Sequence, residues 1–397
     1  ESADGRREVL ICATAEVARL GVQWQAFDLD GRVVASGPVD WEADDVWDLF
    51  DEAPSPAPVT AAAPPVGAPV PPLRPVTIAD FEVPPIGLGC MRLSTQDRPN
   101  REIALAALEA ALDGGIRFFD TANVYAADEH DLGHSEALLK EALERWSGPR
   151  DEVLIASKGG LTRRGRRWLP AARPEQLRSA CEATLSHLGV ERVDLYQLHT
   201  IDRRVPLEDS LGALADLQRE GKIRHIGICN ANAAQIDAAR AVVELASVQG
   251  KCNPFDKAPF KNGLLAHCDS LELPFIAHSP LGGHKGVGRL VKSAPFKAVA
   301  DKHGVTPHAV CLAWLARSLP RGVLIPGPSR VESARSCAAA AQLALDSEDM
   351  DHLDGVFPFA RAFRAPGAPA PQAGGELVIV MGSPASGKTT LALPYEE

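Results

Sequence analysis

Short apolar runs alternate with longer amphipathic stretches through residues 76–355. Eight of the runs have the length and composition of buried strands. They are 84–91, 116–122, 153–158, 193–199, 223–230, 246–253, 274–281 and 322–328. The stretches between them place apolar residues at helical spacing, as in 101–115, 174–189 and 207–222. Eight strands that are each followed by a helix predict an α/β fold, a closed (β/α)8 TIM barrel.

An open, doubly wound sheet is the alternative architecture for this alternation. Such a sheet usually carries a glycine-rich phosphate loop after its first strand. In this chain the first predicted strand is followed by MRLSTQDRPN, residues 91–100, which contains no glycine. The sequence therefore favours the closed barrel.

The segments on either side of the barrel differ from it in composition. Residues 22–28 and 32–36 flank Leu29-Asp30-Gly31, which predicts a hairpin in a small N-terminal α+β fragment, residues 1–52. Residues 53–75 and 356–375 are rich in proline and alanine. Because proline fixes φ and removes an amide donor, both stretches are predicted to be linkers.

Composition narrows the possible partners. The chain is 45% hydrophobic and 23% charged, as in ordinary globular proteins, and no apolar run is long enough to span a membrane. A net charge of -11 argues against general affinity for nucleic acid or anionic membranes. The eight cysteines are scattered, with no CxxC pair and no histidine at metal-ligand spacing. They indicate reduced thiols in a cytoplasmic protein and no metal site.

In a (β/α)8 barrel, catalytic groups project from the carboxyl ends of several strands. Asp120 and Tyr125 follow the second predicted strand, Lys158 ends the third and His199 ends the fourth. Taken singly, each has a structural explanation, since Asp120 could cap a loop and His199 could be a core histidine. Four such residues at three consecutive strand ends are instead typical of a catalytic site.

These strand ends carry a family resemblance. FFDTANVYA (118–126), VLIASKGG (153–160) and VDLYQLH (193–199) resemble the strand ends of the aldo-keto reductases, whose catalytic tetrad is Asp, Tyr, Lys and His. The resemblance extends through 76–355, beginning with VPPIGLGCMRL at 83–93. It implies reduction of a small aldehyde or ketone by hydride from NADPH.

The resemblance also implies a role for each member of the tetrad. Tyr125 would donate a proton to the oxygen on which alkoxide charge develops. Lys158 would lower the pKa of that phenol, and Asp120 would keep Lys158 charged and in place. His199 would orient the carbonyl by hydrogen bonding.

Cofactor contacts follow from the same resemblance. Asn230 and Gln249 match the amide side chains that hold the nicotinamide carboxamide, and His278 lies where a flat side chain supports the nicotinamide ring. The pyrophosphate-binding turn is matched by Ser279, Leu281 and Gly282. The adenosine end is matched by Ser329 and Arg330, which open the last helix and favour NADPH over NADH.

Some positions depart from the family pattern. Cys229 stands where many members have serine, and Ser336 and Cys337 replace an expected Glu-Asn pair, which weakens the expected adenine contact. His278 could also be a buried structural histidine, and Arg330 could be a plain surface residue.

A second motif lies near the C-terminus. A Val/Ile strand, 376–381, leads into GSPASGKT, which matches the P-loop pattern G-x-x-x-x-G-K-[ST]. Its phosphate-binding residues would be Gly382, Gly387, Lys388 and Thr389. Residues 376–397 resemble the truncated start of a P-loop domain of the polynucleotide kinase group. The resemblance implies covalent fusion to a missing C-terminal kinase-like domain, with ATP and Mg²⁺ bound only in a full-length protein.

Two other functions are kept beside the reductase. One is an NADPH-binding regulatory module fused to a P-loop nucleotide kinase, which binds cofactor without turnover. The other is a chain that is chiefly a nucleotide phosphate transferase. Substrate choice in the reductase is expected to lie in loops at 126–134 and 284–295 and beyond 356.

Overall fold

The structure, a computed structural model, describes residues 23–27, 33–38, 70, 72–256, 258–319 and 321–358. The chain forms two units, one of residues 1–63 with 369–397 and one of residues 64–368. In the first unit, β1 (Gln23–Phe27) pairs antiparallel with β2 (Val33–Pro38), which confirms the predicted hairpin strands. The predicted P-loop segment 376–397 lies outside the described residues, as do linker residues 53–69 and 359–375.

The second unit is built on one eight-stranded parallel sheet. Its strands, in spatial order, are β5 (Leu88–Gly89), β6 (Phe118–Asp120), β7 (Leu154–Gly159), β10 (Val193–Leu198), β11 (Ile223–Cys229), β12 (Leu245–Lys251), β13 (Phe275–His278) and β14 (Gly322–Ile325). The sheet closes on itself, because Gly87 N donates to Leu324 O at 2.8 Å and Leu324 N donates to Pro85 O at 2.9 Å. The predicted closed barrel is thus confirmed.

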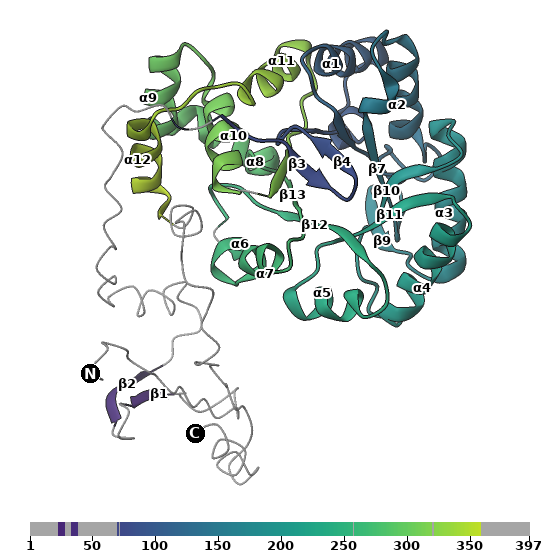
Figure 1. The fold of residues 1–397 in the computed structure, drawn as a ribbon, viewed down its shortest axis with the longest axis horizontal. Helices are drawn as coiled ribbons and strands as arrows, with labels where there is room; N and C mark the ends of the chain where they lie inside the picture. The colour runs from purple at the N-terminus through teal and green to yellow at the C-terminus, as the bar shows by residue number, and fades with distance from the viewer. Residues whose placement is uncertain are drawn as a thin grey trace. The chain divides into compact units, whose positions relative to one another are not determined.

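Helices surround the strands (Figure 1). They are α1 (Arg101–Asp113), α2 (His134–Arg145), α3 (Pro174–Leu188), α4 (Leu207–Arg219), α5 (Ala233–Arg240), α6 (Ala258–Lys261), α7 (Leu264–Ser270), α8 (Gly283–Lys292), α9 (Ala294–His303), α10 (Pro307–Ser318), α11 (Val331–Ala340) and α12 (Ser347–Val356). Their bounds follow local signals in the sequence. The Asn100 side chain caps α1 by accepting from Ile103 N at 2.9 Å. Gly189, with φ 65°, ends α3 in a left-handed conformation that costs glycine little.

One end of the barrel is covered by an antiparallel hairpin, β3 (Val76–Ile78) and β4 (Phe81–Val83). Val76, Ile78 and Val83 pack with Phe118 and Leu154, which lie at the start of their strands. The hairpin therefore closes the amino end of the barrel, and in Figure 1 it lies across the middle of the ring of elements. This arrangement leaves the carboxyl end for the site.

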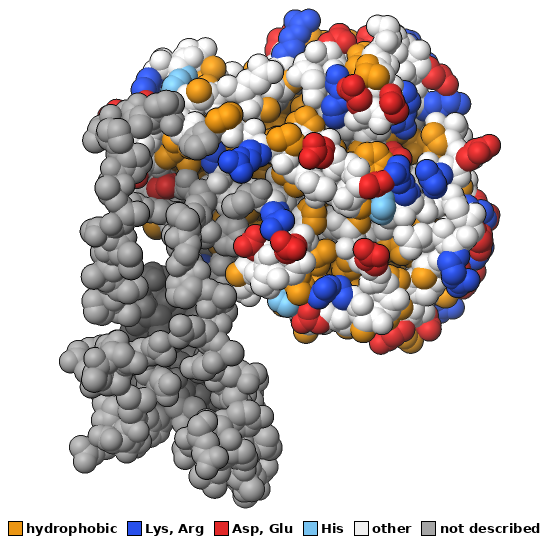
Figure 2. Space-filling model, in the orientation of Figure 1, with side chains coloured by type: hydrophobic (Ala, Val, Ile, Leu, Met, Phe, Trp, Pro, Cys, Tyr) orange, Lys and Arg blue, Asp and Glu red, His pale blue; other side chains and the backbone are white. Residues whose placement is uncertain are grey.

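The polar surface of this unit is mixed in charge. Figure 2 shows acidic and basic side chains interspersed over the visible face of the barrel unit. Among the described residues, no helix is long and apolar enough to cross a membrane.

A second hairpin interrupts the β/α rhythm after β7. Strands β8 (Leu161–Arg164) and β9 (Arg167–Pro170) pair antiparallel before α3 begins. The strand-and-helix pattern did not predict this insertion. The segment 284–295, expected to be a loop, is instead mostly helix α8 and the start of α9, so that expectation was wrong.

Candidate active site

The structure brings the four predicted tetrad residues together at the carboxyl end of the barrel. Asp120 ends β6, Lys158 lies near the end of β7, and His199 directly follows β10. Tyr125 lies in the loop after β6, and its ring packs edge-on against that of His199, with centroids 5.7 Å apart. All four side chains are buried.

Lys158 is the centre of this cluster. Its Nζ donates to the Tyr125 hydroxyl at 3.0 Å and to Thr121 O at 2.9 Å. The same ammonium forms an ion pair with Asp120 Oδ1. Because a buried charge is costly unless it is paired and hydrogen-bonded, these three contacts account for a fully buried lysine.

Burial and charge act in opposite directions on the pKa values of Lys158 and Tyr125. Burial lowers the pKa of Lys158, but Asp120 and Tyr125 raise it, and the resulting pKa lies above its ordinary value. Burial raises the pKa of Tyr125 and the Lys158 ammonium opposes this rise only in part. The Lys158 ammonium lowers the pKa of Tyr125 as expected, but burial raises it by more, so the net pKa lies above its ordinary value. The phenol is accordingly protonated at neutral pH.

The second oxygen of Asp120 is held by two glutamine amides. Gln249 Nε2 donates to Asp120 Oδ2 at 2.8 Å, and Gln197 Nε2 donates to the same oxygen at 3.2 Å. Cys229 Sγ donates to Gln197 Oε1 at 3.6 Å, so the cysteine that replaces the family's serine is part of this network. Gln197 was not predicted, although it lies on β10 two residues before His199, at the spacing that places side chains on the same side of a strand.

Two histidines border the site, and both are neutral at pH 7. Burial, then Lys158 and His278, lower the pKa of His199 well below its usual value. Burial first, and Lys158 second, lower the pKa of His278 to about 4. Asn230 lies between them, since its Nδ2 donates to His199 O at 3.1 Å and its Oδ1 lies 3.4 Å from His278 Nε2. The predicted nicotinamide-binding side chains thus lie beside the tetrad.

The unpredicted hairpin β8–β9 contributes an aromatic wall. Trp168 on β9 packs edge-on against Tyr125 and His199, with centroids 5.9 and 6.2 Å apart. It belongs to an apolar cluster at the mouth with Val124 and Leu161. No strand-end rule identifies Trp168, because it comes from an insertion between a strand and its helix.

The predicted phosphate-binding residues lie at the starts of two helices. Ser279, with φ 54°, and Gly282, with φ 84°, form the turn between β13 and α8, and Leu281 packs partly buried against the core beside them. Arg330 is the exposed residue directly before α11, and Ser329 precedes it. Neither α8 nor α11 has a side-chain cap, so their first-turn amides are open to other acceptors.

The two departures on α11 have their own contacts. Ser336 Oγ lies 2.9 Å from Thr306 Oγ1, and Cys337 is buried in the core. Ser336 is thus joined to the residue before α10 and Cys337 belongs to the core, and the weaker adenine contact stays a prediction.

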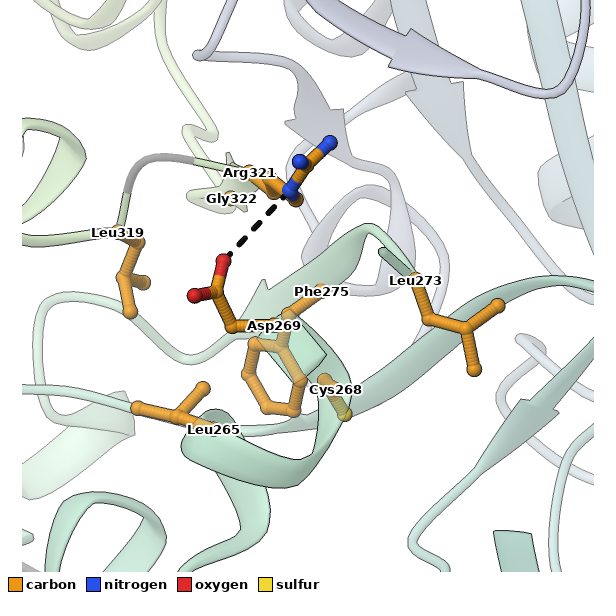
Figure 3. Close-up of a pocket in the computed structure, with 8 residues that line it drawn as sticks. All are labelled: Leu265, Cys268, Asp269, Leu273, Phe275, Leu319, Arg321 and Gly322. Atoms are coloured by element: carbon orange, nitrogen blue, oxygen red, sulfur yellow. Dashed lines mark ion pairs between the residues drawn. The ribbon is translucent and has the colours of Figure 1, made fainter. Parts of the chain in front are cut away.

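A small hollow lies at the other end of the barrel, among the residues of Figure 3. Its wall includes the first residues of two strands, Phe275 and Gly322, and an ion pair between Arg321 Nε and Asp269 Oδ1 at 3.5 Å. Because strands carry their catalytic groups at the carboxyl end, this hollow is remote from the tetrad. Within the described residues, no cluster of His, Cys, Asp or Glu could hold a metal ion.

Fold and site together define a (β/α)8-barrel enzyme in which a buried Lys–Asp ion pair is hydrogen-bonded to a tyrosine hydroxyl. Residues 85–357 match the model of the Aldo/keto reductase family. The chain therefore belongs to the aldo/keto reductase family, and it is an NAD(P)H-dependent oxidoreductase.

Individual relatives agree with this assignment. The chain is 30% identical over 305 residues to probable aldo-keto reductase 1 of Glycine max, covering 69% of this chain and 85% of the relative. It is 32% identical over 285 residues to an uncharacterized oxidoreductase of Schizosaccharomyces pombe, covering 70% and 88%. An aldo-keto reductase from Klebsiella pneumoniae, solved in complex with NADPH, superposes with a TM-score of 0.61 at 27% identity and covers 72% of this chain and 95% of that chain.

Proposed function

We propose that the barrel reduces an aldehyde or ketone with NADPH, and that Tyr125 donates the proton. The observation that carries this proposal is the contact of one buried ammonium, Lys158 Nζ, with both Asp120 and the Tyr125 hydroxyl. A lysine in a purely structural role needs no phenol as its third partner.

The chemistry divides between cofactor and protein. NADPH supplies the hydride when it is bound. Tyr125 gives its proton to the carbonyl oxygen as negative charge develops there, and Lys158 stabilises the phenolate that results. Asp120, fixed by Gln197 and Gln249, keeps the ammonium beside the phenol. Neutral His199 donates a hydrogen bond that orients the carbonyl.

The residues present fit NADPH. Asn230 and Ser279 have φ values of 58° and 54°, in the left-handed region, which is uncommon for residues other than glycine. Asn230, Gln249 and His278 would hold the nicotinamide, and the turn at Ser279–Gly282 with Leu281 would hold the pyrophosphate. Ser329 and Arg330, at the uncapped start of α11, would bind the 2′-phosphate. The NADPH complex of the Klebsiella pneumoniae relative supports this choice.

Turnover tests the proposal. Purified chain should oxidise NADPH, followed at its absorbance band, with members of a broad aldehyde and ketone panel. NADPH binding without oxidation by any substrate would favour the regulatory module instead.

The C-terminal segment supports a second, separate proposal. GSPASGKT after a Val/Ile strand favours the start of a P-loop domain of the polynucleotide kinase type, with Gly382, Gly387, Lys388 and Thr389 around the ATP phosphates and Mg²⁺. Fused to the barrel in a cytoplasmic protein, it would join nucleotide binding to the reductase. Calorimetric titration of ATP·Mg into a full-length protein that includes the kinase-like domain tests this proposal, and Lys388→Ala should abolish the binding.

A further inference from the structure

A buried cation lies beside the catalytic mouth. Arg163, on β8, is 4% exposed. Its Nη2 donates to Ala127 O at 3.0 Å and its Nε donates to Gly165 O at 3.4 Å. Its Nη1 is buried and has no hydrogen-bond partner. The guanidinium therefore keeps one NH2 group unused.

Arg163 also has no carboxylate partner within ion-pair distance among the described residues. Asp128 and Glu129 are near enough to raise its pKa, although burial lowers that pKa more. Both carboxylates bond elsewhere, since Asp128 Oδ1 accepts from His130 N at 2.9 Å and Glu129 Oε2 accepts from Gly165 N. Burying a charge without an opposite charge is costly, and an arginine remains protonated at any relevant pH. A structural anchor alone would not require that cost.

The position of Arg163 connects it to the tetrad. Arg163 and Trp168 are cross-strand partners in the β8–β9 hairpin, and the guanidinium lies 4.8 Å from the indole centroid. Trp168 in turn contacts Tyr125 and His199. The buried cation is therefore one side chain removed from the proton donor, a separation that a single small substrate can span.

The other basic side chains beside Tyr125 cannot bind an anion on the substrate. Lys158 is committed to Asp120, Thr121 and Tyr125, and both His199 and His278 are neutral at pH 7. Trp168 is only half-buried, so the group that covers the guanidinium borders solvent.

Building on the proposed carbonyl reduction, we propose that Arg163 binds an anionic group, a carboxylate or a phosphate, on the carbonyl substrate. The flat guanidinium matches either oxyanion, and its free Nη1 supplies a charge-assisted hydrogen bond once the half-buried Trp168 ring that covers it moves aside. Trp168 then lies along the part of the substrate between the anion and the carbonyl. The substrate class is thus a small aldehyde or ketone with an acidic group a few bonds from the carbonyl.

Matched substrate pairs test the inference and separate the two anions. The carboxylate arm compares 4-carboxybenzaldehyde with its methyl ester, and the phosphate arm compares glyceraldehyde 3-phosphate with glyceraldehyde. Initial rates of NADPH oxidation at physiological salt give the ratio of kcat/KM, charged over neutral. We expect a ratio on the order of tenfold to a hundredfold in at least one arm, as for loss of a charge-assisted contact.

Variants connect that ratio to one side chain. Arg163→Gln should bring the ratio close to one, and Arg163→Lys should restore part of it. Arg166→Gln is the matched control, because it removes the same charge from an exposed position in the same hairpin and should leave the ratio unchanged. Since each ratio compares two substrates on one preparation, a partly unfolded variant does not distort it.

Each outcome decides the question. A wild-type ratio near one in both arms overturns the inference but leaves carbonyl reduction standing, and so does a high ratio that Arg163→Gln does not change. If no member of the broad aldehyde and ketone panel is turned over, the reductase proposal fails. Calorimetry then tests the anion site independently of turnover. It compares the affinities of 4-carboxybenzyl alcohol and its methyl ester in the presence of NADP⁺. Equal affinities of the two alcohols overturn the site, and tighter acid binding that Arg163→Gln abolishes supports it.

Discussion

Burial and charge act in opposite directions on the Tyr125 phenol, and burial is the larger effect on its pKa. The protonated phenol is the form that a proton donor needs. Tyr125→Phe should lower kcat/KM about 10²–10⁴-fold, the usual contribution of a positioned acid, with little change in NADPH affinity. Steady-state rates and a fluorescence titration measure the two quantities. Tyr196→Phe, which alters another buried phenol outside the tetrad, should remain active. Full activity of folded Tyr125→Phe would remove the proton-donor role.

Cofactor preference also belongs to a single residue. Arg330 is exposed directly before α11, where a guanidinium and open helix amides can hold a 2′-phosphate together. We expect NADPH to bind more tightly than NADH. Arg330→Ala should reduce the ratio of the two dissociation constants by roughly tenfold to a hundredfold. Fluorescence quenching gives both dissociation constants. Arg335→Ala, exposed on the same helix, is the control and should keep the preference. Equal affinities of the wild-type chain for NADPH and NADH would contradict the predicted preference.

At the level of elements, helix α2 packs against α3 through a buried carboxylate. Glu136 on α2 accepts from Ser157 Oγ at 2.6 Å and lies 3.3 Å from His187 Nδ1 on α3. The nearby Glu136 carboxylate raises the pKa of His187, against the effect of burial. A raised pKa contributes stability that is present below the unfolded value near 6.5 and is lost as pH rises through the folded value.

His187→Gln should therefore destabilise the barrel more at pH 6 than at pH 9. The side chain is about one-third exposed, so the difference in unfolding free energy should stay below about 1 kcal/mol. Urea denaturation at the two pH values measures it, and His130→Gln, on an exposed loop, should show no such difference. An equal loss at both pH values would mean that only packing was removed.

The elements show what a sequence can predict about this protein. Regular repeats of apolar runs predicted all eight barrel strands, and strand ends predicted four residues that the structure brings together. The sequence did not predict the β8–β9 hairpin. Arg163 and Trp168 lie in a short arginine-rich insertion whose apolar residues do not follow the pattern of a core strand. The sequence predicted that Lys158 lowers the pKa of Tyr125, but not the larger effect of burial, because desolvation depends on all the groups that pack around the phenol.

At the scale of the whole molecule, the barrel unit is closed by contacts between its own first and last elements. Its first and last strands join through Gly87 and Leu324, and α12 completes the core beyond them. Phe357 stacks on Phe296 with centroids 5.3 Å apart, and Trp314 Nε1 donates to Asp354 Oδ1 at 2.8 Å. Among the described residues, these contacts join α12 and Phe357 to the barrel core.

Deleting residues 365–397 should therefore leave both the unfolding midpoint of the barrel and NADPH turnover unchanged. A deletion that starts at residue 346 removes α12 with Phe357, and exposes Trp314 and Phe296. It should lower stability by roughly 3–5 kcal/mol or more, as loss of a large buried aromatic does. Thermal unfolding and initial rates on the two truncated chains, beside the 397-residue chain, measure the contrast. If the shorter deletion also destabilises the barrel, residues after 364 contribute contacts to it, and the P-loop segment is then part of the barrel's folding unit rather than a separate one.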